Sequence, residues 1–148
     1  MTTHELYVVP YSSPTTARVD RKLILSVDDE LGVLYARYKL LDAAGYAVLS
    51  ASDGVQALGI FGQQKVDLVL LDYALPQMDG GVVAEAMKTY RPNVPVVIVS
   101  GAEVPKQCLS ICDGHVQKGD DPEQLLRTIR QLLFPTSSPE IDRSEKAS

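Results

Sequence analysis

Five short apolar runs recur along the chain, and amphipathic segments separate them. Continuous runs of valine, isoleucine and leucine are typical of strands that are covered on both faces, as in a parallel sheet. We therefore predict five buried strands. They lie at residues 23–27, 47–51, 66–72, 94–100 and, as the weakest pattern, 115–118.

Between these runs, apolar residues recur at the three- and four-residue intervals of a helix. Capping signals agree with this pattern: Ser52 or Asp53 can begin the second helix, and Asp121 followed by Pro122 can begin the last. The fourth segment is the poorest helix, because it is short and contains Pro105. The expected helices span residues 30–44, 53–64, 79–90, 102–113 and 121–134.

The order of these elements indicates the fold class. A strand followed by a helix, repeated along the chain, gives an α/β fold with a five-stranded parallel sheet, doubly wound as (βα)5, and helices on both faces. The fourth helix of this fold is expected to be shortened. We predict one domain over residues 21–134, a flexible or extended leader at 1–20 and a disordered tail at 135–148.

The composition and net charge of the chain limit the kinds of partner that it can be expected to bind. Of the 148 residues, 45% are hydrophobic, which supports a normal core, and the net charge of −5 disfavours binding to nucleic acid. The sequence contains no apolar stretch of membrane-spanning length and no signal-peptide pattern at its start. Two cysteines, Cys108 and Cys112, form no disulfide framework, so we expect a reducing, cytoplasmic setting.

The carboxyl ends of the predicted strands carry the candidate chemistry, because parallel sheets of this kind bind ligands there. Three acidic residues in a row follow the first strand, although burying like charges together is costly. The other strand ends add a carboxylate, a hydroxyl and an ammonium group. The residues are Asp28, Asp29 and Glu30 directly after the first strand, and Asp72, Ser100 and Lys118 as the last residues of the third, fourth and fifth.

This set of side chains predicts a phosphoryl-transfer site. Clustered carboxylates provide the hard oxygen ligands that select Mg²⁺ or a similar ion, which would compensate the acidic run. Asp72 remains as a carboxylate nucleophile, Lys118 is a cation suited to phosphate, and Ser100 can donate a hydrogen bond to a phosphoryl oxygen. The alternative is structural: the acidic run could cap the first helix, and Lys118 could be a surface lysine.

Four stretches, in this order, carry a resemblance to a known family: "ILSVDDE", "DLVLLDYALPQMDG", "VPVVIVSGA" and "HVQK". Any one of them alone would be weak evidence, but together they are specific. On these stretches, the region 22–134 resembles the receiver domain of two-component response regulators, a bacterial signalling family. The resemblance implies a flavodoxin-like, three-layer chemotaxis-regulator fold.

The resemblance also implies roles for the acidic residues. Asp72 would accept a phosphoryl group from a phosphohistidine on a sensor histidine kinase or a histidine phosphotransfer protein. Asp29, Asp72 and the backbone carbonyl of Ala74 would ligate Mg²⁺ (or Mn²⁺) directly. Asp28 would act mainly through a metal-bound water.

For the remaining positions, the resemblance implies that Lys118 binds the phosphoryl group and that Ser100 is a switch hydroxyl that reorients toward it. The family usually has an aromatic switch residue three positions before its lysine. His115 stands there in this chain. His115 could act as a polar switch or be an exposed residue of an edge strand, and both remain open. Gly119 replaces the usual proline after the lysine, so we expect the loop that holds Lys118 to differ.

The leading functional hypothesis is a single-domain response regulator of a phosphorelay that signals by protein–protein contact. It would not be an enzyme beyond catalysing its own phosphorylation and dephosphorylation, and it would contact neither nucleic acid nor membrane. One alternative is an unphosphorylated pseudo-receiver scaffold. A less favoured one is a Mg²⁺-dependent aspartyl phosphohydrolase, which would need a second aspartate where Ala74 stands.

Overall fold

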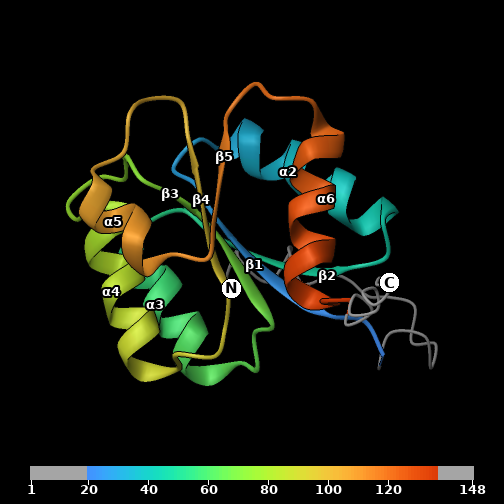
Figure 1. The fold of residues 1–148 in the computed structure, drawn as a ribbon, viewed down its shortest axis with the longest axis horizontal. Helices are drawn as coiled ribbons and strands as arrows, with labels where there is room; N and C mark the ends of the chain where they lie inside the picture. Colours follow the sequence, from blue (N-terminus) through green and yellow to red (C-terminus); the bar gives the residue numbers. More distant parts are fainter. Residues whose placement is uncertain (1–19, 137–148) are drawn as a thin grey trace, which may run out of the picture.

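The computed structural model describes residues 20–136, so the expected leader and tail lie almost entirely outside it. Within this range strands and helices alternate along the chain, as the apolar pattern predicts (Figure 1). The strands are β1 (Leu23–Val27), β2 (Ala47–Ala51), β3 (Leu68–Asp72), β4 (Val96–Ser100) and β5 (Gly114–Gln117). The helices are α2 (Leu31–Ala43), α3 (Gly54–Gln63), α4 (Gly80–Tyr90), α5 (Lys106–Ile111) and α6 (Pro122–Leu133).

All five strands pair in parallel in the order β2-β1-β3-β4-β5. The chain therefore moves outward from β1 to one edge, returns to β3 and then continues to the other edge. The register pairs Val27 with Leu71 and Asp72 with Val99, so the carboxyl ends of β1, β3 and β4 lie side by side. This edge of the sheet, at the point where the winding reverses, is where such folds bind ligands.

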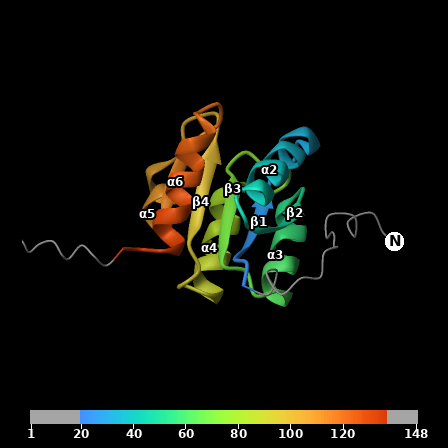
Figure 2. The same cartoon turned by 90° about the vertical axis from the view of Figure 1, so that its right-hand side faces the viewer.

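Two helical layers cover the sheet, as Figures 1 and 2 show. One layer contains α2 and α6, and Leu41 and Ile129 from these helices belong to one buried cluster with Ile24 of β1. The other layer contains α3, α4 and α5 and buries Phe61 and Met87. The predicted doubly wound, three-layer α/β architecture is confirmed.

Side-chain caps explain where several helices begin. The carboxylates of Asp53 and Asp79 accept hydrogen bonds from Gln56 N and Val82 N at the starts of α3 and α4. Asp121 does the same for α6, which has proline in its first turn. These orphan N–H groups would otherwise need water or a ligand.

The predicted third and fourth strands begin two residues too early. Pro95 has no N–H to donate to a strand ladder, and β4 begins directly after it. At the other strand, the Asp67 carboxylate accepts a hydrogen bond from Leu23 N at 2.7 Å. Asp67 N also donates to the Leu23 carbonyl at 2.8 Å, so residue 67 contacts β1 through both its side chain and its backbone just before β3 starts.

Helix α5 has six residues and begins after Pro105, which confirms the shortened fourth helix. A polar cluster holds the chain that leaves it. Lys88 Nζ donates to the Asp113 carboxylate at 2.8 Å, and the same carboxylate accepts a hydrogen bond from Val96 N at 2.8 Å. The short connection into β5 is thereby tied to α4 and to the start of β4.

Candidate functional site

The two-residue period of a strand explains why the polar side chains meet. Residues Ile24 of β1 and Leu68 and Leu70 of β3 face the layer of α2 and α6. Asp28 and Asp72 continue these even-numbered positions, and both lie beyond or at the end of their strands on the same face. Lys118 follows Val116, which faces this layer as well. The predicted side chains therefore converge from three strands.

The convergence creates an acidic cluster. Carboxylate oxygens of Asp28, Asp29 and Asp72 all lie within 4.8 Å of one another. Asp28 is fully buried and Asp72 is 3% exposed, whereas Asp29 is exposed. Asp28 Oδ1 accepts a hydrogen bond from Glu30 N at 2.9 Å, but Asp28 Oδ2 accepts none. A buried carboxylate oxygen without a hydrogen bond, beside two more carboxylates, fits a divalent cation with oxygen ligands.

Lys118 supplies positive charge to this cluster. Its Nζ lies 2.9 Å from Asp28 Oδ2, an ion pair without the geometry of a hydrogen bond, and it donates to Asp72 Oδ2 at 3.2 Å. Burial alone would lower the pKa of Lys118, but Asp28 and Asp72 outweigh this effect and raise it. Lys118 is therefore firmly charged.

The surroundings of Asp72 disfavour the charged form of its carboxyl group. Burial and then the charge of Asp28 raise the pKa of Asp72, although Lys118 and the N–H of Ala74 act in the opposite direction. The Ala74 N–H donates to Asp72 Oδ1 at 3.2 Å. One lysine thus does not fully compensate two neighbouring carboxylates. That Ala74 offers its carbonyl to a metal ion stays a prediction.

The sequence reasoning missed Arg37. This α2 residue is 7% exposed, its Nη1 donates to Ser26 Oγ at 3.2 Å, and its Nη2 lies 3.6 Å from Asp28 Oδ2. Burial lowers the pKa of Arg37, while the charges of Asp28 and Asp72 act against this change. The available signal was its spacing, because Leu34, Arg37 and Leu41 are the buried residues of one helix face.

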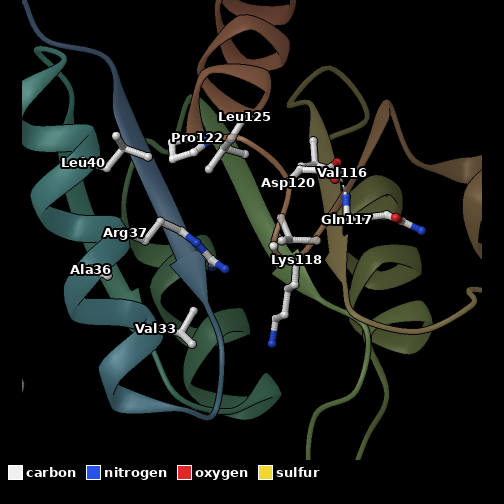
Figure 3. A pocket seen from close by; sticks show the side chains of 12 residues that line it. Val33, Ala36, Arg37, Leu40, Val116, Gln117, Lys118, Asp120, Pro122 and Leu125 are labelled. Carbon is white, nitrogen blue, oxygen red and sulfur yellow. Dashed lines mark hydrogen bonds between the residues drawn. The ribbon is translucent and has the colours of Figure 1, made fainter.

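A cavity of about 490 Å³ adjoins the cluster on the side of α2 and α6. In Figure 3, Arg37 reaches toward it from α2 and Lys118 from the chain after β5, and their nitrogen atoms point to the same end of the sheet. Apolar side chains form most of the remaining wall. They include Val33, Leu40, Val99, Val116, Pro122 and Leu125.

Comparison with known families decides the identity of the fold. The family model of the response regulator receiver domain matches residues 24–130. The chain belongs to this family. Among curated relatives, the receiver domain is 33% identical over 128 residues to "Probable transcriptional regulator ycf27" of Cyanophora paradoxa, covering 83% of this chain and 53% of that protein. It is 38% identical over 77 residues to sporulation initiation phosphotransferase F of Bacillus subtilis, covering 52% of this chain and 62% of that protein.

Solved structures agree with this assignment. A CheY-like receiver domain protein from Methanospirillum hungatei has a TM-score of 0.74 at 28% identity, covering 77% of this chain and 94% of that one. The response regulator TrrA of Thermotoga maritima, in complex with Mg²⁺ and BeF, has a TM-score of 0.73 at 26% identity, covering 76% and 99%. The chain spans about half the length of the curated regulators that it matches.

Ser100 of the receiver domain does not contact Asp72. The residue is 2% exposed, and its hydroxyl donates to the Ala102 carbonyl at 2.7 Å and accepts from Ala102 N at 3.0 Å. Ser100 also continues Val96 and Ile98, which face the opposite layer, that of α3, α4 and α5. Its predicted movement toward a phosphoryl group would have to break both hydrogen bonds.

His115 is exposed and lies on β5, an edge strand. This placement matches the edge-strand alternative, and the switch role stays a prediction. Gly119 has a φ of 91°, a left-handed conformation that favours glycine, and no described residue has a cis peptide bond. The loop after Lys118 thus makes its turn with glycine, and the lysine still reaches the acidic cluster.

The two cysteines lie apart from this chemistry. Within the part of the chain that the structure describes, the acidic cluster is the one group with a metal-binding arrangement, and Cys108 and Cys112 are free thiols. None of the helices described is long and apolar enough to cross a bilayer.

Burial raises the pKa of Cys112 to about 12, and it raises the pKa of Cys108 as well. Because only the thiolate is nucleophilic, we expect both cysteines of the folded domain to react with iodoacetamide at pH 8 at least about tenfold more slowly than free cysteine. Intact mass over time measures this rate, and the domain unfolded in guanidinium is the control. Rapid labelling without unfolding would contradict the burial of these thiols.

Proposed function

We propose that Asp72 accepts a phosphoryl group from a phosphohistidine of a sensor histidine kinase or a histidine phosphotransfer protein. The observation that carries this proposal is the cluster of Asp28, Asp29 and Asp72 within 4.8 Å, with Lys118 Nζ 3.2 Å from the acceptor carboxylate. Asp72 is the last residue of β3, at the edge of the sheet where such folds bind ligands. Phosphorylation would then be signalled through contact with another protein.

The bonds that form and break in the transfer belong to Asp72 and to the phosphohistidine of the partner. A carboxylate oxygen of Asp72 forms the new P–O bond while the P–N bond of the phosphohistidine breaks, and the electron pair leaves with the imidazole nitrogen. Lys118, already fixed beside Asp72, offsets charge on the phosphoryl oxygens. We infer that the domain catalyses only its own phosphorylation and dephosphorylation.

The donor set supports Mg²⁺ or Mn²⁺ as the cofactor. Asp28, Asp29 and Asp72 would hold the ion, and the unsatisfied Asp28 Oδ2 is the buried atom that favours this choice. When bound, such an ion supplies positive charge to the carboxylates and the transferring group. The related TrrA structure contains Mg²⁺ with BeF, which supports the same assignment here.

The proposal is tested by intact mass after incubation with acetyl phosphate and Mg²⁺. We expect the wild type to gain one phosphoryl group, about 80 Da, and Asp72→Asn to gain none. EDTA should abolish the gain. Asp72→Asn is a matched control because it keeps the size of the side chain and removes its charge.

The alternative functions give different results in this experiment. A wild type that binds Mg²⁺ but gains no mass would contradict the proposal and favour the pseudo-receiver scaffold. Continuous release of phosphate from p-nitrophenyl phosphate would instead favour a phosphohydrolase.

A further inference from the structure

Arg37 lies beside a carboxylate of the acidic cluster that would hold a metal ion. Its guanidinium lies 3.6 Å from Asp28 Oδ2, the oxygen atom that accepts no hydrogen bond, and its side chain is only 6% exposed. We propose that Arg37 is a resident counter-cation of the acidic cluster: it neutralises Asp28 when no metal is bound and thereby weakens Mg²⁺ binding. This inference rests on the metal site of the proposed function.

The balance of charge supports this role. The three carboxylates and Lys118 leave a net charge of −2 in the cluster, and Arg37 reduces it to −1. Lys118 Nζ lies closer to Asp28 Oδ2, at 2.9 Å, but it also neighbours Asp72, so Arg37 adds a second cation beside a carboxylate whose burial is costly. The same positive charge, several ångström from a divalent ion, repels it by an amount worth about tenfold in affinity.

Hydrogen bonding holds Arg37 in this position. Ser26, a fully buried residue of β1, accepts the Nη1 hydrogen at 3.2 Å on the face that α2 covers. The cavity beside Arg37 leaves one side of it without tight packing (Figure 3). Ser26 and Asp28 therefore set the direction of the guanidinium group and keep its positive charge beside the acidic cluster.

The test compares wild type, Arg37→Met and Arg37→Lys by calorimetric titration with Mg²⁺ and by melting temperature with and without the ion. Arg37→Met removes the charge and keeps most of the length, so its Mg²⁺ affinity should rise about tenfold. Its melting temperature without metal should fall, and saturating Mg²⁺ should restore much of the loss. Arg37→Lys keeps the charge, so its affinity should stay within about twofold of the wild type.

Several results would overturn the inference. One is a Mg²⁺ affinity of Arg37→Met that is unchanged or weaker than that of the wild type. Another is an increase in Mg²⁺ affinity that is equal in Arg37→Lys and Arg37→Met, because the charge of residue 37 would then not be the cause. If Arg37→Met is unfolded without metal, circular dichroism during the Mg²⁺ titration decides: folding on addition of the ion supports the inference, and persistent unfolding contradicts it.

The proposed function can fail separately. A wild type that is phosphorylated by acetyl phosphate, combined with unchanged affinity in Arg37→Met, refutes only the role of Arg37. If the wild type binds Mg²⁺ but is not phosphorylated, and Arg37→Met binds Mg²⁺ more tightly, only the proposed function is refuted. A wild type that does not bind Mg²⁺ refutes both.

Discussion

Gly80→Ala is expected to lower the melting temperature by about 10 °C and to reduce phosphorylation of Asp72 strongly. A Cβ atom at residue 80 would lie 2.6 Å from the backbone oxygen of Asp72 and 2.7 Å from the Cα of Tyr73. Both are backbone atoms, so no side chain can rotate away. Overpacking of this kind costs about 1–3 kcal/mol or more. The displacement falls on the segment that carries the acceptor.

The hydrogen bond from Gly80 N to the Tyr73 carbonyl, at 2.7 Å, explains why the approach is so close. This bond closes the loop after β3 against the end of that strand. Thermal unfolding followed by circular dichroism measures the stability, and intact mass after acetyl phosphate measures the phosphorylation. Gly59→Ala is a suitable control, because a Cβ there would meet nothing within 4 Å and alanine favours the helix. Equal stability of the two variants would sink the prediction.

Lys118→Met is expected to destabilise the metal-free domain by about 3 kcal/mol, the lower end for a buried ion pair that loses one partner. The lower end applies because 27% of the Lys118 side chain is exposed, which allows solvent to screen the remaining charges. Asp28 and Asp72 would be left with Arg37 as the nearby cation. Phosphorylation by acetyl phosphate should fall by at least about a hundredfold.

The loss of stability should depend on pH. The pKa of Asp72 is already raised above its ordinary value in the wild type, and removal of Lys118 should raise it further. A carboxyl group with a raised pKa takes up a proton more readily when folded, so its destabilising effect is absent at low pH and grows as the pH rises through its folded pKa. Urea unfolding of Lys118→Met should therefore give a smaller deficit at pH 5 than at pH 7.

The double variant Lys118→Met/Asp72→Asn separates charge from packing. It removes the second carboxylate and leaves Asp28 paired with Arg37. Most of the lost stability should return, although phosphorylation should not. If the double variant is as unstable as Lys118→Met, the cost comes from lost packing of the lysine stem instead.

Much of this fold could be predicted because its signals are local. The apolar run "LILSV" is a strand over the expected residues 23–27, and Asp53 caps α3 through its carboxylate. The convergence of Asp28, Asp72 and Lys118 also followed from the sequence, since the carboxyl ends of parallel strands meet at one edge. The two-residue period of the strands then sets the face on which each side chain lies.

Other features depend on contacts between distant residues. In a sequence, a charged residue on an apolar helix face is ordinarily expected to reach solvent. Arg37 is buried instead, and only its contacts with Ser26 and Asp28 show why. The hydrogen bonds of Ser100 with Ala102 depend on the path of the loop, which no periodicity reports. The starts of β3 and β4 were misplaced because an apolar run does not show where ladder pairing begins.

The sheet acts as a partition between Asp72 and Ser100, although they end neighbouring strands. By the two-residue period of their strands, Asp72 lies on the side of α2 and α6, whereas Ser100 lies on the side of α3, α4 and α5. Residues 101–105 connect the end of β4 to α5, and the Ser100 hydroxyl forms its hydrogen bonds within this loop. If the Ser100 hydroxyl moved away, both the N–H and the carbonyl of Ala102 would lose their hydrogen bonds. At the other end of α5, the chain stays fixed by the ion pair between Asp113 and Lys88.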